Sequence, residues 1–160
     1  KVTLKPGYDQ IGRLQAKIPD GWKREQPASS MRIAQFQISG KDGGGELIVF
    51  SGIGGSVDAN LERWYGQFKS ETQQSVSETA VKSHDHINGM NVTFSYAYGT
   101  YMKSSMGMGG STTEMPNYAL TAAIVSAPDG PYYFKGTGSK STMDAHKANF
   151  ETFIQSIEAL

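Results

Sequence analysis

Cysteine is missing from the chain, and so are long apolar runs and an excess of either charge. The lack of cysteine excludes thiol catalysis, disulfide bonds and thiolate metal sites, but it fits any cellular compartment. Fifteen basic residues balance fifteen acidic ones without runs of like charge, so we expect no nucleic-acid interface and no surface for anionic lipid. No apolar run approaches the roughly 18 residues that cross a bilayer, so we expect no membrane span.

A leader is also missing, because the sequence begins at Lys1 without an initiator methionine or a hydrophobic segment. We interpret it as a mature or trimmed chain from which any signal sequence has been lost. The chain has instead nineteen glycines and many small polar residues. This composition is typical of secreted or periplasmic β-rich domains.

The length favours a single domain over residues 1–160, large enough to bury roughly two-thirds of the surface of the unfolded chain. Residues 1–12 show no periodicity, and we expect an irregular N-terminal arm there. Alternating side chains predict a strand over residues 14–18 that ends at the turn Pro19-Asp20-Gly21. Further strands are predicted at residues 31–38, 46–50, 80–86, 91–101, 118–127 and 132–137. The run at 46–50 is apolar on both faces, which indicates a central strand.

The strand at residues 91–101 carries large and small side chains on opposite faces. An Asn88-Gly89 pair joins it to the preceding strand and predicts a two-residue hairpin turn. The large face consists of Val92, Phe94, Tyr96 and Tyr98. The small face consists of Thr93, Ser95, Ala97 and Gly99. We expect a helix to pack closely against the small face.

Two amphipathic helices are predicted, each of about four turns. The first follows a glycine turn at residues 52–56, has Ser56 or Asp58 as its N-cap and should bury Trp64 against the sheet. Its apolar stripe consists of Val57, Leu61, Trp64, Tyr65 and Phe68. The second is capped by Ser141 or Thr142, and its stripe consists of Met143, His146, Phe150, Phe153, Ile154 and Ile157. About seven antiparallel strands flanked by these helices define a single α+β domain.

Several of these segments resemble the PsbP-like fold. The strand closed by Pro19-Asp20-Gly21-Trp22 is similar to the opening of that fold, and the Tyr/Phe-rich strand at residues 130–135 with its following helix is similar to the ending. Residues 60–68 resemble the inserted helix of uncharacterised bacterial members, many of them lipoproteins. The family also includes an extrinsic subunit of photosystem II and a nuclear-import factor that binds Ran.

The resemblance covers residues 13–158 and implies an α/β/α sandwich. It also implies an extracytoplasmic location, periplasmic or secreted, with a lipid anchor upstream of residue 1 if the chain is of the lipoprotein type. Because no catalytic motif defines the family and its members mostly bind partners or ions, the resemblance implies a non-catalytic role. It assigns no functional residue, since fold alone does not specify function.

The glycine turn at residues 52–56 stands between a strand and a helix, as in a dinucleotide-binding fingerprint. The third glycine of that fingerprint falls on Val57, however, and Gln73 stands at the position where an acidic residue would hold a ribose. No G-K-S/T sequence indicates a P-loop. We therefore interpret the turn as structural, with glycine supplying positive φ, and keep a small anion at the helix start as the alternative.

His84 and His86 are the first candidate metal ligands. Residues i and i+2 of a strand share a face, so both imidazoles could reach one zinc, copper or nickel ion. A third ligand is not identifiable, and a solvated hairpin explains the pair more simply. The methionine-rich loop at residues 102–115 offers thioethers, foremost Met106 and Met108, that suit Cu(I). For this loop we rank an apolar flap first, a protein contact second and copper third.

His146 lies on the apolar stripe of the last helix, where we expect a hydrogen-bonded histidine at the edge of the core. No G-x-S-x-G or H-E-x-x-H motif occurs, so serine-hydrolase and zincin chemistry lack support, while paired carboxylates that meet only in the fold stay open. An aromatic face would stack bases or sugars if exposed, but without a basic patch we assign it to the core. It consists of Phe94, Tyr96, Tyr98, Tyr132 and Phe134.

Together these observations favour a non-catalytic extracytoplasmic accessory domain that binds a protein partner or a small ligand and uses no cofactor. The alternative is a copper- or zinc-binding protein that uses the 102–115 loop or the His84/His86 pair. An uncharacterised enzyme is the third hypothesis.

Overall fold

The computed structural model describes residues 3–104 and 111–160. These residues form eleven strands and four helices. In chain order the elements are β1 (Tyr8–Ile11), β2 (Leu14–Lys17), β3 (Trp22–Glu25), β4 (Arg32–Ile38), β5 (Gly45–Ser51), α1 (Val57–Tyr65), β6 (Phe68–Lys69), α2 (Val76–Thr79), β7 (Val81–Ile87), β8 (Met90–Ser104), β9 (Thr112–Ala127), β10 (Gly130–Ser139), α3 (Lys140–Ala145), α4 (Lys147–Gln155) and β11 (Glu158–Ala159).

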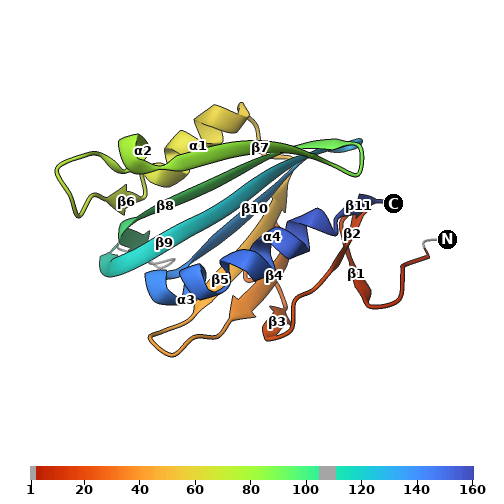
Figure 1. Ribbon diagram of the computed structural model, residues 1–160, viewed down its shortest axis with the longest axis horizontal. Helices are drawn as coiled ribbons and strands as arrows, with labels where there is room; N and C mark the ends of the chain where they lie inside the picture. Colours follow the sequence, from red (N-terminus) through yellow and green to blue (C-terminus); the bar gives the residue numbers. More distant parts are fainter. Residues whose placement is uncertain (1–2, 105–110) are drawn as a thin grey trace.

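An eight-stranded antiparallel sheet forms the centre of the molecule. Its strand order is β3-β4-β5-β10-β9-β8-β6, and β7 pairs with β8 beside this path. The long strand β8 thus pairs with β9 on one side and with β6 and β7 on the other. A second sheet, with the order β1-β2-β11, is small. Figure 1 shows α1 and α2 over one face of the main sheet and α3 and α4 over the other.

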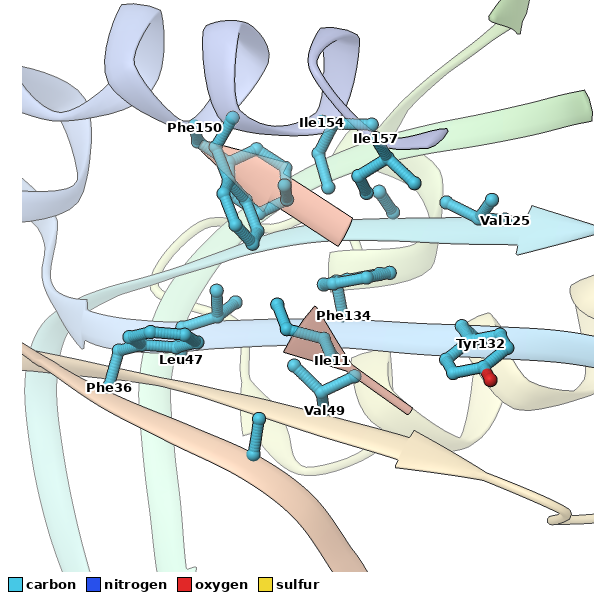
Figure 2. Close-up of a cluster of buried hydrophobic side chains, with 14 of the residues drawn as sticks. Ile11, Phe36, Leu47, Val49, Val125, Tyr132, Phe134, Phe150, Ile154 and Ile157 are labelled. Carbon is cyan, nitrogen blue, oxygen red and sulfur yellow. The ribbon is translucent and has the colours of Figure 1, made fainter. Parts of the chain in front are cut away.

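Each face of the main sheet buries its own hydrophobic cluster. On one face, Phe150 and Ile154 of α4 point toward Phe134 on β10 (Figure 2). On the other face, Trp64 of α1 is 2% exposed and packs edge-on against Tyr133, with ring centroids 6.2 Å apart. The predicted burial of Trp64 is therefore confirmed. Two helical layers around one antiparallel sheet also confirm the predicted α+β class.

Several local predictions are confirmed by the sheet. The strand β5 lies between β4 and β10, so its apolar run occupies the predicted interior position. The hairpin between β7 and β8 turns at Asn88 and Gly89, whose φ angles of 48° and 84° are those that a two-residue turn of the primed type requires. On the small face of β8, the hydroxyl groups of Tyr65 and Ser95 are 2.5 Å apart, so α1 packs as closely as expected.

The strand count is larger than the sequence predicts, because the additional strands are short. β6 and β11 have two residues each, and strands of that length show no alternation that the sequence could reveal. The expected irregular arm at residues 1–12 contains β1, which pairs with β2 and buries Ile11 at 1% exposure. The strand predicted at 14–18 forms as β2, but it belongs to the small sheet and not to the main one.

Both predicted helices are shorter than expected. α1 ends at Tyr65, and Phe68 lies in β6, where its ring packs 5.0 Å from that of Tyr101. The C-terminal helix is divided at His146 into α3 and α4. Neither predicted cap acts as one, because Thr142 donates its hydroxyl to the carbonyl of Gly43 and Ser141 donates to Asp42. Contacts with the β4–β5 loop thus determine where α3 begins.

Candidate functional site

A hollow of about 280 Å³ lies between α4 and the strands β7 and β8. We call it the α4–β7 groove. On β7, Ser83 and Asp85 are opposite Phe94 and Val92 of β8, so these side chains share the face of the sheet that α4 covers. The groove is lined by Val81, Ser83, His84, Asp85, Phe94, Ser95, Tyr96, Thr121, Ala122, Lys147, Phe150, Glu151 and Gln155.

The floor of the groove is aromatic. Phe94, Tyr96 and Tyr98 are only half-buried, because α3 and α4 lie over β9 and β10 and leave this part of β8 partly open. Phe94 contacts Phe150 edge-on at 6.4 Å between ring centroids. The prediction that this face belongs to the core is confirmed for Tyr132 and Phe134 on β10, which are fully buried, while the three β8 residues are partly buried and pack against the edge of the same cluster.

The wall of the groove is polar. Lys147, Glu151 and Gln155 follow one another at intervals of four along α4, so they line the same side of the helix. Nε2 of Gln155 donates to Oδ2 of Asp85 over 3.0 Å and joins α4 to β7 at one end. The ammonium of Lys147 lies 5.8 Å from the ring centroid of Tyr96. A ligand in the groove would meet an aromatic floor and a charged and amide-bearing wall.

Two titratable groups of the groove have shifted pKa values. The backbone N–H of His86 and the side chain of Gln155 donate to Asp85 and lower the pKa of its carboxyl. Partial burial raises the pKa of Tyr96 to about 12, and the Asp144 carboxylate that accepts its hydrogen bond at 2.7 Å adds to the effect. At neutral pH, Asp85 is therefore charged and Tyr96 is neutral.

Lys135 is a buried cation on the opposite face of the sheet, beneath α1. Its Nζ donates to Oε1 of Gln67 over 2.5 Å and lies 5.8 Å and 5.9 Å from the ring centroids of Trp64 and Tyr101. Burial lowers the pKa of Lys135 to about 8, even though the Glu46 carboxylate favours the charged form. The side chain is 8% exposed, so its ammonium is enclosed by the amide and the two rings.

His84 and His86 lie on the exposed strand β7 and share a face, as their spacing predicts. Nδ1 of His86 is 3.0 Å from Oδ1 of Asn91, and Nδ1 of His84 is 3.2 Å from the hydroxyl of Thr93. Both partners stand on β8, directly opposite the histidines. Within residues 3–104 and 111–160, no cluster of three His, Asp or Glu side chains could hold a metal ion.

The remaining candidates from the sequence are the glycine turn, which is structural, and the methionine loop, which lies partly outside the described residues. In the glycine turn, Gly52 and Gly55 have φ angles of 73° and 98°, and Ser56 caps α1 by accepting from the N–H of Ala59. This turn therefore uses glycine for its backbone conformation, as we interpreted it. Met106 and Met108, the foremost copper candidates, lie outside the described residues. Near the end of the β8–β9 hairpin, Met102 is opposite Glu114 and Met115 is opposite Tyr101, and both methionines are half-buried.

Sequence reasoning missed Lys135 and the polar wall of the groove. Lys135 stands alone within the apolar run of β10, and a lone lysine between Phe134 and Gly136 was the feature that could have indicated it. The groove residues come from β7 and α4, which are far apart in the sequence. The four-residue spacing of Lys147, Glu151 and Gln155 was visible, but nothing in it indicated that β7 would face them.

Comparisons with known proteins define the fold. No protein-family model and no curated protein sequence matches the chain. An antiparallel sheet between two helical layers, as described above, is the architecture of an α/β/α sandwich. The solution structure of cyanobacterial PsbP (CyanoP) from Synechocystis sp. PCC 6803 shares it with a TM-score of 0.56 at 12% sequence identity, over 95% of this chain and 89% of that one. The chain therefore has a PsbP-like fold.

A crystal structure from Bacteroides thetaiotaomicron VPI-5482 is also similar, with a TM-score of 0.44 and 16% identity. The match covers 98% of this chain but 49% of that one, so the chain spans about half the length of that protein. None of the helices formed by residues 3–104 and 111–160 combines the length and apolarity needed to cross a bilayer.

Proposed function

We propose that the chain is a non-catalytic, extracytoplasmic binding module and that its ligand site is the α4–β7 groove. The observation that carries the proposal is the half-exposed aromatic floor of Phe94 and Tyr96, which lies in a hollow of about 280 Å³ and below a wall of charged and amide groups. Ligand sites typically combine an apolar surface with a few polar groups that fix the orientation of the ligand.

The pKa shifts in the groove support binding over catalysis. A general acid or base works best when its pKa lies near the operating pH. The pKa of Asp85 is lowered and that of Tyr96 is raised, so both shifts move these groups away from neutrality. Both groups are also held by structural hydrogen bonds, to Gln155 and Asp144 respectively. They are suited to orienting a ligand and not to exchanging a proton with it.

The chemistry of the groove fits a small polar molecule with one flat apolar face, such as a sugar ring. The aromatic floor would take the apolar face of the ring. Asp85, Glu151 and Lys147 would form charge-assisted hydrogen bonds with its hydroxyl groups. The volume is near the lower end of the range for small-molecule sites, so one or two sugar units would fill it.

Titration with glucose, galactose and N-acetylglucosamine tests this proposal, with amide resonances as the readout. At least one sugar should shift resonances in residues 83–85, 94–96 and 147–155. Glu151→Ala should raise the dissociation constant of that sugar about tenfold or more, because one charge-assisted hydrogen bond is lost. Glu62→Ala, a matched change of an exposed glutamate on α1, should leave it unchanged. Shifts that avoid all three segments with every sugar would refute the proposal.

The extracytoplasmic part of the proposal is supported by the PsbP-like fold and by a composition rich in glycine and small polar residues. Osmotic-shock fractionation of the native cells, followed by detection of the chain with an antibody, tests it. We expect the chain in the shock fluid or, if it carries a lipid anchor, in the membrane fraction. Recovery with the cytoplasmic markers would contradict this location.

A further inference from the structure

The strand β7 is an edge strand. Among the described residues it pairs with β8 alone, and six of its seven residues are exposed. Its register with β8 places Lys82, His84 and His86 opposite Ser95, Thr93 and Asn91. Because side chains alternate along a strand, these three residues share the face of the hairpin turned away from the α4–β7 groove. The two imidazoles therefore stand on the face opposite the groove, and of the two residues only His84 also borders it.

Hydrogen bonds from β8 orient both imidazoles. The carbonyl oxygen of the Asn91 side chain can only accept, so Nδ1 of His86 carries the proton and Nε2 carries the free lone pair. The Thr93 hydroxyl lies 3.2 Å from Nδ1 of His84 and can accept the proton of that nitrogen in the same way. Histidines that bind a metal almost always donate their other ring N–H to an oxygen acceptor, which fixes the tautomer and the ring orientation. Both rings thus have the arrangement of preoriented metal ligands.

The local charges are compatible with a cation. Lys82, the third member of this face, has its ammonium 3.4 Å from Asp58 and 4.0 Å from Glu62 on α1. Its charge is therefore balanced by two carboxylates next to it. The chain as a whole is neutral, so two copies do not repel each other through net charge.

One chain supplies only half of a zinc site. Structural zinc is almost always bound by four ligands in a tetrahedron, and imidazole is one of its preferred ligands. No third His, Asp or Glu joins the pair within the described parts of the chain. A second copy placed about a two-fold axis would contribute the same two imidazoles, since such contacts use the same patch on both subunits.

We propose that His84 and His86 of two copies of this chain bind one zinc ion and that this ion holds the copies together as a dimer. The backbone edge alone is a poor dimer contact, because Oδ1 of Asp85 accepts the N–H of His86 at 2.7 Å and occupies a donor that a neighbouring strand would need. The metal therefore provides the link, and the chain is a monomer without it.

Analytical ultracentrifugation of the untagged protein with and without zinc chloride tests the proposal. Half an equivalent of zinc should convert the monomer into a dimer, and EDTA should reverse the change. Elemental analysis of the isolated dimer should give one zinc ion for two chains. His84→Ala and His86→Ala should each abolish dimerisation, and their circular dichroism spectra should match that of the parent because both side chains are exposed. Lys82→Ala, on the same face, should still dimerise.

Three results would overturn the proposal. These are a monomer at stoichiometric zinc, a dimer that survives the double substitution of both histidines, and one zinc ion per chain without a change in mass. The test is distinct from the sugar titration, because it measures dimerisation by zinc in the absence of sugar and because His86 does not line the groove. Failure of one proposal therefore leaves the other intact.

Discussion

The indole N–H of Trp22 donates a hydrogen bond of 3.2 Å to Nδ1 of His146. Nε2 of the same imidazole lies 3.1 Å from the carbonyl oxygen of Ser39, to which it donates. The neutral ring of His146 thus connects β3, the β4–β5 loop and the junction between α3 and α4. These contacts explain why the C-terminal helix is divided at this residue.

His146→Ala should lower the free energy of unfolding by about 1–3 kcal/mol, because the indole N–H of the buried Trp22 would lose its acceptor. Urea denaturation at pH 7, followed by tryptophan fluorescence, measures the change. Asn149→Ala is the matched control, since Asn149 is exposed and its side chain also donates to Nδ1 of His146, at 3.3 Å. It should change stability by less than about 0.5 kcal/mol. Equal effects of the two substitutions would contradict the assigned role of His146.

Lys135→Met should raise the free energy of unfolding at pH 7 by about 1–3 kcal/mol. The substitution removes a buried charge but keeps an apolar side chain, and the lost bond to Gln67 offsets part of the gain. A destabilised Lys135→Met variant would show that the ammonium stabilises the fold.

The same lysine predicts a pH dependence. Its pKa is about 8 in the folded chain and 10.5 when unfolded, so the unfolded state binds more protons between these values. The contribution of Lys135 to stability therefore rises as the pH increases from about 8 to 10.5. Tyr96 acts in the opposite direction above pH 10, because its pKa is raised to about 12. Urea denaturation between pH 7 and 10 should show a rise that Lys135→Met abolishes.

Gly138→Ala should destabilise the chain by about 1–3 kcal/mol or more. A Cβ atom at this position would lie 2.5 Å from Cα of Gly45 and 2.9 Å from the carbonyl oxygen of Gly44, and neither backbone atom can give way. The control is Gly54→Ala, where an added Cβ meets nothing within 4 Å. Thermal unfolding of the two variants should differ by several degrees. Similar melting temperatures would contradict this close approach of β5 and β10.

Trp64→Ala should lower the free energy of unfolding by about 3–5 kcal/mol, the usual cost of emptying a buried tryptophan site. Its ring fills the space between α1 and Tyr133 and covers the Lys135 ammonium. Chemical denaturation followed by circular dichroism provides the measurement, since the substitution removes a fluorophore. Val81→Ala, at the exposed start of β7, should change stability by less than about 0.5 kcal/mol.

Periodicity predicted the elements that bury one clear face. The alternation along β8 predicted which of its side chains share a face of the sheet, and the stripe around Trp64 predicted which face of α1 is buried. The Asn88-Gly89 pair specified its hairpin because the turn has strict backbone requirements. These features are local, so a single sequence contains them.

Features that depend on tertiary contacts were not predictable in the same way. Phe68 continues the helical stripe of α1, but its pairing with Tyr101 places it in a strand. The spacing of His146 fits the apolar stripe of one continuous helix, and only its hydrogen bonds with Trp22 and Ser39 mark the end of α3. Phe94 and Tyr96 have the pattern of core residues, and their exposure depends on where α4 crosses the sheet. The same dependence hid the groove and the environment of Lys135.

The pairing of β5 with β10 has a consequence for how the chain folds. The strands β3, β4 and β5 form one meander of adjacent hairpins, and β8, β9 and β10 form another. The two are joined along the register from Tyr132↔Ser51 to Gly138↔Gly45, between segments far apart in the sequence. Bringing distant segments together costs loop entropy before any contact repays it. We therefore expect docking of the two meanders along this seam to be the slow step of folding, and the enclosure of Lys135 to complete only with it.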